Sequence, residues 1–437
     1  MQIQKTIKFK VGELSNSKRE RLDLVLNKSL LCLKDIIQIA IIENTSSNKK
    51  LHHLCYDIMR KKYKLPACVI HQCRNKAVEM LKSWNRLQRR NLKKQILPPN
   101  PKASRIRYDN VVFNILKTES KKFEYFVSFL ISSGYKKDKS RIYLPLIVNS
   151  DYQKEYIKDL VNKKYKLCAS DLVKKNKDYF IHITFSKEIN IPKVNSSFQP
   201  IGIDIGINNL AVVSVAQQKN PVKFFSGKRL IWKLKQTQKK NAEFQKNCNL
   251  RLQRKLNQEL VDYRDFLNHQ ISSYVIKRAL ELERPVIVLE NLRYIQQTTK
   301  HRKKYKNIFF NWSFKKLQEQ ILYKANWEGI PVLFIEPNYI SQICPKCFST
   351  NKRKKHNYKC SHCGYSANSD FVGAVNIRKK FFEFIQFEEQ ASINYALNIT
   401  CSEPKALKIR SVQNSIKLED VSPSKPKGMG IRNIEIL

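Results

Sequence analysis

The spacing of apolar residues divides the first part of the chain into a strand and a group of helices. Ile3, Ile7 and Phe9 fall on one face of the first ten residues, which is the period of a strand. Helical patterns then fill residues 11–96, and the last of them, from Ala67 to Lys94, has a face rich in Lys and Arg. That face is either a solvated surface or a surface that contacts a nucleic-acid backbone.

A proline-rich stretch, LPPNPK at Leu97–Lys102, ends this helical part, because proline cannot continue a helix. Strand-like segments follow, with one helix near Tyr152–Lys163. We expect them to form a small β-barrel or sheet that the N-terminal strand completes. The expected strands are Arg105–Leu116, Phe123–Ile131, Arg141–Val148 and Tyr179–Phe185.

After a second linker, Asn190–Pro200, the pattern changes to that of an α/β domain. One long helical stretch, or two helices, covers Trp232–Glu283. Continuous apolar runs are typical of strands that are buried on both faces. The expected strands are Ile201–Ile207, Leu210–Ala216, Val222–Phe225, Val286–Leu289 and Val332–Ile335.

The charge of the chain points to a polyanionic partner. The 437 residues include 83 Lys and Arg against 36 Asp and Glu, a net charge of +47 that runs from Lys5 to Arg432. A compact fold repels itself at such a charge unless a polyanion screens it, and contacts with phosphates release counterions. We therefore expect nucleic acid as the partner, ahead of a solubility surface or an anionic membrane.

Several other classes of protein are disfavoured. No apolar run reaches the ~18 residues that a membrane-spanning helix needs, and the start MQIQKTIKFK has no apolar signal-peptide core. We expect a cytoplasmic location and no membrane partner. The chain has 10 Gly and no G-x-x-x-x-G-K-[ST] motif, which disfavours chemistry driven by nucleoside triphosphates.

Three carboxylates stand where predicted strands end or a helix begins. Asp204 lies in GIDIGINNLAVVS, Glu290 in PVIVLENL, and Asp370 in ANSDFVGAVNI. Burying an unpaired carboxylate among apolar residues is costly, so each is either a cap or an ion pair, or the three hold metal together. As a set they suit two Mg²⁺ ions about 4 Å apart that hydrolyse a phosphodiester, with Asp204 between the ions.

Four cysteines have the spacing C-x2-C-x12-C-x2-C. Two such pairs complete a tetrahedral Zn²⁺ site, and four protein ligands make the zinc structural. His356 and His362 lie nearby, but four thiolates already close the site. The basic stretch Lys352–Lys355 between the pairs is a candidate contact for a phosphate backbone. The predicted ligands are Cys344, Cys347, Cys360 and Cys363.

In this order the motifs resemble the TnpB family, the RNA-guided nucleases of insertion sequences that are ancestral to miniature type V CRISPR effectors. The segments GIDIGINNLAVVS, VIVLENL, Trp312–Pro337, SQICPKC, YKCSHCGY and SDFVGAVNI carry the resemblance, which is specific over residues 200–380. It implies that Asp204, Glu290 and Asp370 are RuvC catalytic residues that bind Mg²⁺. It also implies two partners, a guide RNA and a double-stranded target DNA with a short flanking motif.

The resemblance further implies a multidomain α+β protein. Its centre is an RNase H-like (RuvC) α/β nuclease domain that a zinc ribbon interrupts. The expected parts are a wedge β-barrel (1–10 and 97–195), a helical recognition domain (11–96), the RuvC-like nuclease (196–340 and 367–383), the target nucleic-acid-binding zinc ribbon (341–366) and a partly disordered tail (384–437).

One segment departs from the family pattern. The family commonly reads Asp-Arg-Asp-x-Asn-Ala-Ala around the third acid, whereas residues 368–374 here read NSDFVGA. The third acid, Asp370, is kept, and the neighbouring Asp, Arg and Asn are replaced by Asn368, Ser369 and Val372. The expected function is that of an RNA-guided DNA endonuclease in a prokaryotic cytosol or nucleoid, either transposon-encoded or CRISPR-associated, and a monomer or a homodimer. The alternatives are an RNA-independent transposase or resolvase, and a catalytically silent RNA-guided repressor.

Overall fold

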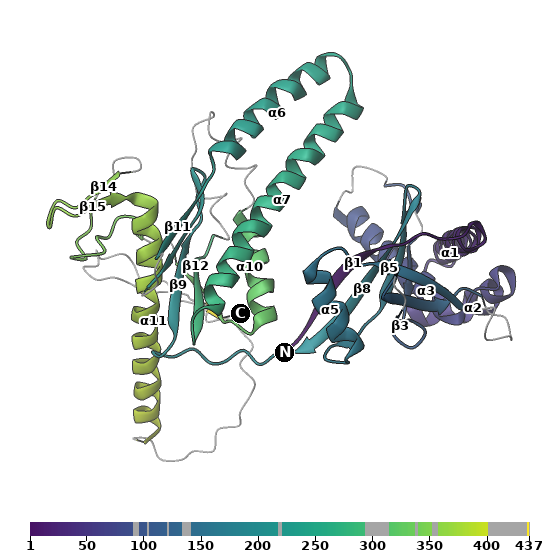
Figure 1. Cartoon of the computed structure of the whole chain (residues 1–437), viewed down its shortest axis with the longest axis horizontal. Coiled ribbons are helices and arrows are strands. Elements are labelled where there is room, and N and C mark those ends of the chain that lie inside the picture. Colours follow the sequence, from purple (N-terminus) through teal and green to yellow (C-terminus); the bar gives the residue numbers. More distant parts are fainter. Residues whose placement is uncertain are drawn as a thin grey trace. The chain divides into compact units, whose positions relative to one another are not determined.

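The computed structural model divides the chain into two compact units, Met1–Glu188 and Ile189–Leu437. Each unit is built on its own β-sheet (Figure 1). No described helix combines the length and the apolar character needed to cross a bilayer. The structure describes residues 1–90, 96–102, 105–119, 122–132, 141–216, 221–292, 314–336, 340–351, 357–400 and 435–436, with side chains up to residue 387.

The first unit combines three helices with an antiparallel sheet of the order β2-β7-β8-β1-β5-β4-β3, in which β6 also pairs with β8. Helices α1 (Asn16–Ile42), α2 (Asn48–Tyr63) and α3 (Ala67–Arg90) directly follow β1 (Gln2–Val11). The remaining elements are β2 (Arg105–Tyr108), β3 (Asn114–Lys117), β4 (Tyr125–Leu130), β5 (Arg141–Ile147), α5 (Asp151–Val161), β6 (Lys166–Leu167), β7 (Ser170–Lys175) and β8 (Asp178–Glu188).

The N-terminal strand completes this sheet, as the alternation of its residues predicted. It pairs with β8 from Gln2 opposite Glu188 to Lys10 opposite Phe180, and it also pairs with β5. The strand predicted at Arg105–Leu116 was wrong, because a turn divides the segment into β2 and β3.

Whether this sheet forms a barrel depends on its two ends. No described ladder joins β2 to β3. Instead, the rings of Tyr108 and Phe129, from β2 and β4, pack with their centroids 4.4 Å apart. Side chains therefore bring the two sides of the sheet together, and the wedge β-barrel stays a prediction.

The second unit is a mixed α/β structure. Its sheet has the order β11-β10-β9-β12-β13-β16, parallel between β9, β12 and β13 and antiparallel elsewhere. The strands are β9 (Gln199–Asp204), β10 (Asn209–Val215), β11 (Val222–Ser226), β12 (Pro285–Glu290), β13 (Val332–Ile335) and β16 (Glu435–Ile436). The main helices are α6 (Lys228–Lys246), α7 (Leu250–Leu280), α10 (Phe314–Glu328) and α11 (Ser369–Thr400).

Helices cover both faces of this sheet, with α7 and α10 on one side and α11 on the other (Figure 1). Alternate residues of β12 face opposite ways, so that Ile287 packs toward α7 and α10 while Val288 packs toward Phe381 of α11. The α/β order predicted from the apolar runs is confirmed. The stretch Trp232–Glu283 forms two helices rather than one.

The predicted tail begins later than residue 384. Helix α11 continues to Thr400, and Phe384 and Ile385 are buried against the sheet. Near the C-terminus, Ile436 pairs with Leu333 of β13. The rest of the predicted tail, residues 401–434, lies outside the described residues.

Candidate metal centres

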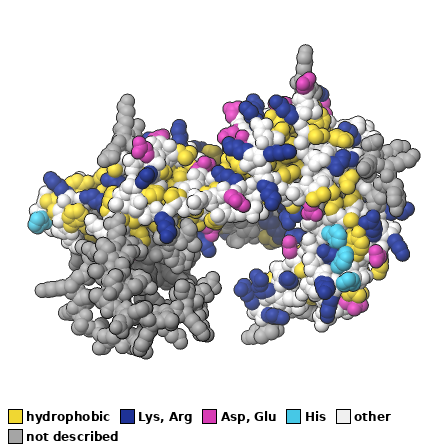
Figure 2. All heavy atoms as spheres, turned by 90° about the horizontal axis from the view of Figure 1, so that it is seen from below, with side chains coloured by type: hydrophobic (Ala, Val, Ile, Leu, Met, Phe, Trp, Pro, Cys, Tyr) yellow, Lys and Arg dark blue, Asp and Glu magenta, His cyan; other side chains and the backbone are white. Residues whose placement is uncertain are grey.

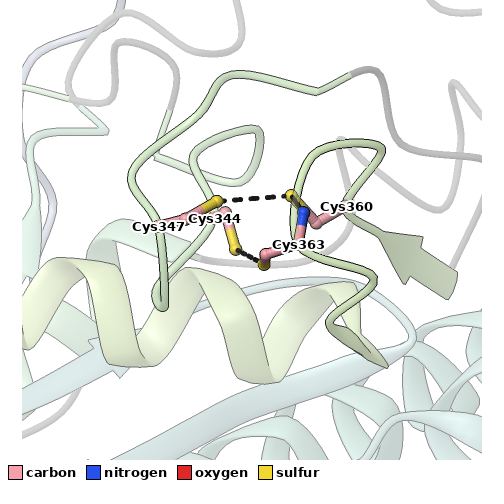
Figure 3. A group of neighbouring side chains, drawn as sticks. All are labelled: Cys344, Cys347, Cys360 and Cys363. Carbon is pink, nitrogen blue, oxygen red and sulfur yellow. Dashed lines mark hydrogen bonds between the residues drawn. The ribbon is translucent and has the colours of Figure 1, made fainter.

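The four cysteines predicted from their spacing come together in space. Their sulfur atoms all lie within 4.8 Å of one another. Cys344 lies 3.6 Å from Cys363, and Cys347 lies 3.5 Å from Cys360, measured between sulfurs (Figure 3). The predicted grouping is therefore confirmed, whereas Lys352–Lys355 lies outside the described residues.

Each cysteine pair is held by a similar tight turn. The Phe348 amide donates to the Cys344 carbonyl in the first, and the Gly364 amide donates to the Cys360 carbonyl in the second. Both donor residues have left-handed backbones, with φ of 61° at Phe348 and 70° at Gly364. These turns bring the two thiols of each pair to the same side.

The Ser349 hydroxyl affects the pKa values of two of the cysteine thiols. The Ser349 oxygen lies 3.1 Å from the sulfurs of both Cys347 and Cys360. Hydrogen bonding with Ser349 is the largest cause that lowers the pKa of Cys360 to about 5 and that of Cys347 to about 7, and at Cys347 the Ser349 backbone also contributes. At Cys363 the backbone amide of Tyr365 favours the thiolate, but burial and neighbouring cysteines outweigh it and raise the pKa to about 12. Four sulfur donors in this state fit a tetrahedral Zn²⁺ ion, whose charge stabilises all four thiolates.

The sheet register places two of the predicted acids side by side. Leu289 of β12 is opposite Ile203 of β9 in a parallel pair, so Glu290 and Asp204 stand one residue further along neighbouring strands. Neighbouring strands lie about 4.8 Å apart. Glu290 follows Val288, which faces α11, by two residues and so shares its face. Both carboxylates are half-buried at the carboxyl edge of the sheet.

Helix α11 lies unusually close to β9 at this edge. A Cβ atom added at Gly202 would lie 2.2 Å from the carbonyl oxygen of Ala374 and 2.6 Å from the amide nitrogen of Arg378. A Cβ atom added at Gly373 would lie 2.9 Å from a carboxylate oxygen of Asp204. At position 202 only glycine permits this approach, because a Cβ atom there would meet the backbone of α11, whereas at position 373 it would meet only the Asp204 side chain. The first turn of α11 therefore lies directly against Asp204.

The third predicted acid, Asp370, is on that first turn. The Asn368 side-chain oxygen accepts from the amides of Asp370, at 2.9 Å, and Phe371, at 3.3 Å, and so caps the helix. Asn209, at the start of β10, donates to the Asp370 carboxylate at 2.8 Å. Asn368, which departs from the family pattern, thus supports the helix start that carries Asp370.

Three contacts around the acids were not predicted. Besides Asn209, the Gln318 amide of α10 donates to the Glu290 carbonyl at 2.6 Å. Burial lowers the pKa of Lys380 on α11, while the carboxylates of Glu383, Glu290 and Glu336 act in the opposite direction.

One feature of the sequence could have predicted the close approach of α11 to β9. Gly202 lies inside the strand motif GIDIG, and a glycine within a strand often marks a close approach of another backbone.

The carboxylates are less tightly grouped than the thiols. Of the described His, Cys, Asp and Glu side chains, only the four cysteines lie close enough together to bind an ion as they stand. The assignment of Asp204, Glu290 and Asp370 as magnesium ligands stays a prediction.

The mixed α/β unit and its four-cysteine module were compared with models of known protein families. Residues 314–377 match the model of the "Cas12f1-like, TNB domain". Residues 181–296 match the model described as "Probable transposase". The two matched regions are the parts of the second unit that contain the module and most of the sheet, with the last strand of the first unit.

Comparisons with individual proteins agree. A TnpB-like protein of Methanocaldococcus jannaschii is 29% identical over 54% of this chain and 85% of its own length. The CRISPR-associated endodeoxyribonuclease Cas12f1 of Sulfoacidibacillus thermotolerans is 26% identical over 74% of this chain and 79% of its own. The two family models and these relatives support the TnpB and miniature type V family.

A solved structure supports the fold. The cryo-EM structure of a Cas12f1–sgRNA–target DNA complex contains a chain with a TM-score of 0.58 to this one and 15% identity. The alignment covers 86% of this chain and 99% of that chain. The fold of the family thus extends over both units of this protein.

Proposed function

We propose that this protein is an RNA-guided DNA endonuclease. The observation that carries the proposal is the register that sets Asp204 beside Glu290, with the helix of Asp370 packed against Asp204. The strand order β11-β10-β9-β12-β13, with β10 antiparallel to its neighbours, is the one expected of an RNase H-like nuclease. Relatives named as CRISPR-associated endodeoxyribonucleases support the same reaction.

In this proposal Asp204, Glu290 and Asp370 would together hold two Mg²⁺ ions. Bound there, the metals supply an activated water and stabilise the leaving oxygen of the phosphodiester. Asn209 orients the Asp370 carboxylate, and Gln318 fixes the end of β12 at Glu290. A zinc ion held by the four cysteines would have a structural role, because four protein ligands would complete its coordination.

The charge of the chain suits the proposed partners. Lys and Arg side chains recur over the visible face of both units (Figure 2). Such a surface binds backbone phosphates without reading sequence. Pairing between a guide RNA and the target strand would then read sequence, while the protein reads backbone shape and a short flanking motif.

The test is to express the chain with the DNA that flanks its gene, purify it and sequence any RNA that comes with it. The complex is then incubated with Mg²⁺ and plasmids that do or do not match the 3′ or 5′ variable part of that RNA. We expect one discrete RNA and cleavage of the matched plasmid only. Cleavage without RNA would instead indicate a transposase or resolvase, and matched binding without cleavage would indicate a repressor.

A further inference from the structure

The chain entering the four-cysteine module is held by a side chain of α11. Asn376 is only 5% exposed, and its amide donates to the carbonyl oxygens of Ile340 and Ile343, each at 2.7 Å. Ile343 directly precedes Cys344, the first predicted zinc ligand. One buried amide therefore fixes the entry to the module.

The chain leaving the module runs straight into the same helix. Strand β15 (Ser366–Asn368), paired with β14 (Asn357–Lys359), ends where α11 begins. Its last residue, Asn368, opposite Asn357 in this pair, is the cap that accepts from the Asp370 amide. No linker separates the module from the helix that carries Asp370.

The core of the module also rests on α11. Val372, which is fully buried, packs in one cluster with Cys344, Tyr358 and Cys360. Two turns further on, the Lys379 ammonium donates to the Pro345 carbonyl. Entry, exit and core of the module are thus fixed to the first three turns of α11, the turns that also place Gly373 against Asp204.

We propose that the four-cysteine module sets the position of Asp370 relative to Asp204, with Asn376 as the positioning residue between them. The inference rests on the proposed function, because it treats Asp370 as a metal ligand. Small modules with four thiolates are ordered only when zinc offsets the charges of the thiolates. Loss of zinc would release both ends of the module and fray the start of α11, since helix ends without partners open first.

Zinc removal from the full chain, purified with its RNA, is the first arm of the test. Hydrogen exchange over residues 369–376 and the binding of Mn²⁺ are measured before chelation, after it, and after zinc is restored. We expect faster exchange and an affinity for Mn²⁺ that falls about tenfold or more, both reversed by zinc. Unchanged exchange and Mn²⁺ affinity in the zinc-free protein would overturn the inference.

The second arm compares Asn376→Ala with Gln386→Ala, which removes an exposed amide from the same helix. Asn376→Ala should keep its fold by circular dichroism, weaken Mn²⁺ binding about tenfold and lower kcat with little change in DNA affinity. High Mn²⁺ concentrations should restore its rate. The control should match the parent, and an equal loss in both variants, or a loss that metal does not restore, would contradict the positioning role.

The two proposals fail differently. If the native complex does not cleave DNA, the proposed function falls, while exchange and Mn²⁺ affinity still decide the coupling. If the native complex cleaves DNA but zinc removal leaves exchange and Mn²⁺ affinity unchanged, only the positioning role falls.

Discussion

The four-cysteine module and the carboxylate edge are two candidate metal centres that the chain builds in opposite ways. The cysteines lie within a span of 20 residues, and two similar turns bring their sulfurs within 4.8 Å. The acids lie between positions 204 and 370, and strand register and helix packing bring them to one edge. A local centre is encoded by spacing, whereas a distributed one depends on the whole sheet.

This difference explains how each centre should respond to change. Any single cysteine is essential to its site, but distant residues have little influence on the turns. The carboxylate edge depends on residues that bind no metal, such as Gly202 and Asn368, because these set where α11 begins and how closely it approaches β9.

Replacing an acid should have the largest effect. Asp204→Ala removes a proposed magnesium ligand, so cleavage should fall by at least about 100-fold while target binding persists. Plasmid cleavage and gel-shift assays measure the two. Asp178→Ala, which removes an exposed partner of Lys10, is the matched control and should cleave normally. Loss of binding in Asp204→Ala would contradict a purely catalytic role.

Replacing a cysteine should empty the other centre. Cys344→Ser should reduce zinc from about one ion per chain to well below that, because a structural site needs all four ligands. Metal analysis by mass spectrometry measures the content. Cys248→Ser changes an exposed free thiol and should retain the zinc. A parent protein that folds without zinc would refute the site.

Two glycine substitutions separate backbone contact from side-chain contact. Gly202→Ala places a methyl group against the backbone of α11 and should destabilise the protein by about 1–3 kcal/mol. Gly373→Ala meets only the Asp204 carboxylate, which can rotate, and alanine favours a helix by about 1 kcal/mol. Thermal unfolding should therefore show a loss for Gly202→Ala only. Equal losses of stability in the two variants would mean that the close approach of α11 to β9 does not order the carboxylate edge.

The helix cap should have the smallest effect. Asn368→Ala should cost about 1 kcal/mol of stability and lower the rate of cleavage. Ser15→Ala removes the cap of α1, whose side chain accepts from the Lys18 amide, and is the control. It should cost a similar stability with no change in rate. If both variants cleave equally well, the start of α11 does not control the carboxylate edge.

The sequence was sufficient for features that depend on local spacing. The cysteine pattern predicted the module, and the apolar runs predicted β12 and β13 because these strands are buried on both faces. The sequence was insufficient where long-range packing determines where a strand or helix ends. A turn within Arg105–Leu116 and the buried Phe384 and Ile385 beyond the predicted tail boundary were missed.

The same limit applies to the carboxylate edge. Asp204, Glu290 and Asp370 were chosen as acids among apolar residues, and the structure places Asp204 beside Glu290 in register and the helix of Asp370 against Asp204. Asn209 was not chosen, because a single polar residue at the start of a strand has no distinctive spacing. Its role is visible only once its hydrogen bond to Asp370 is known.

Anomalous X-ray scattering from crystals of the complex grown with Mn²⁺ tests the central claim most directly. Data at the zinc and manganese edges distinguish the two metals. We predict zinc among the sulfurs of Cys344, Cys347, Cys360 and Cys363, and two manganese ions about 4 Å apart against Asp204, Glu290 and Asp370. Manganese bound elsewhere, with none at these three carboxylates, would contradict it.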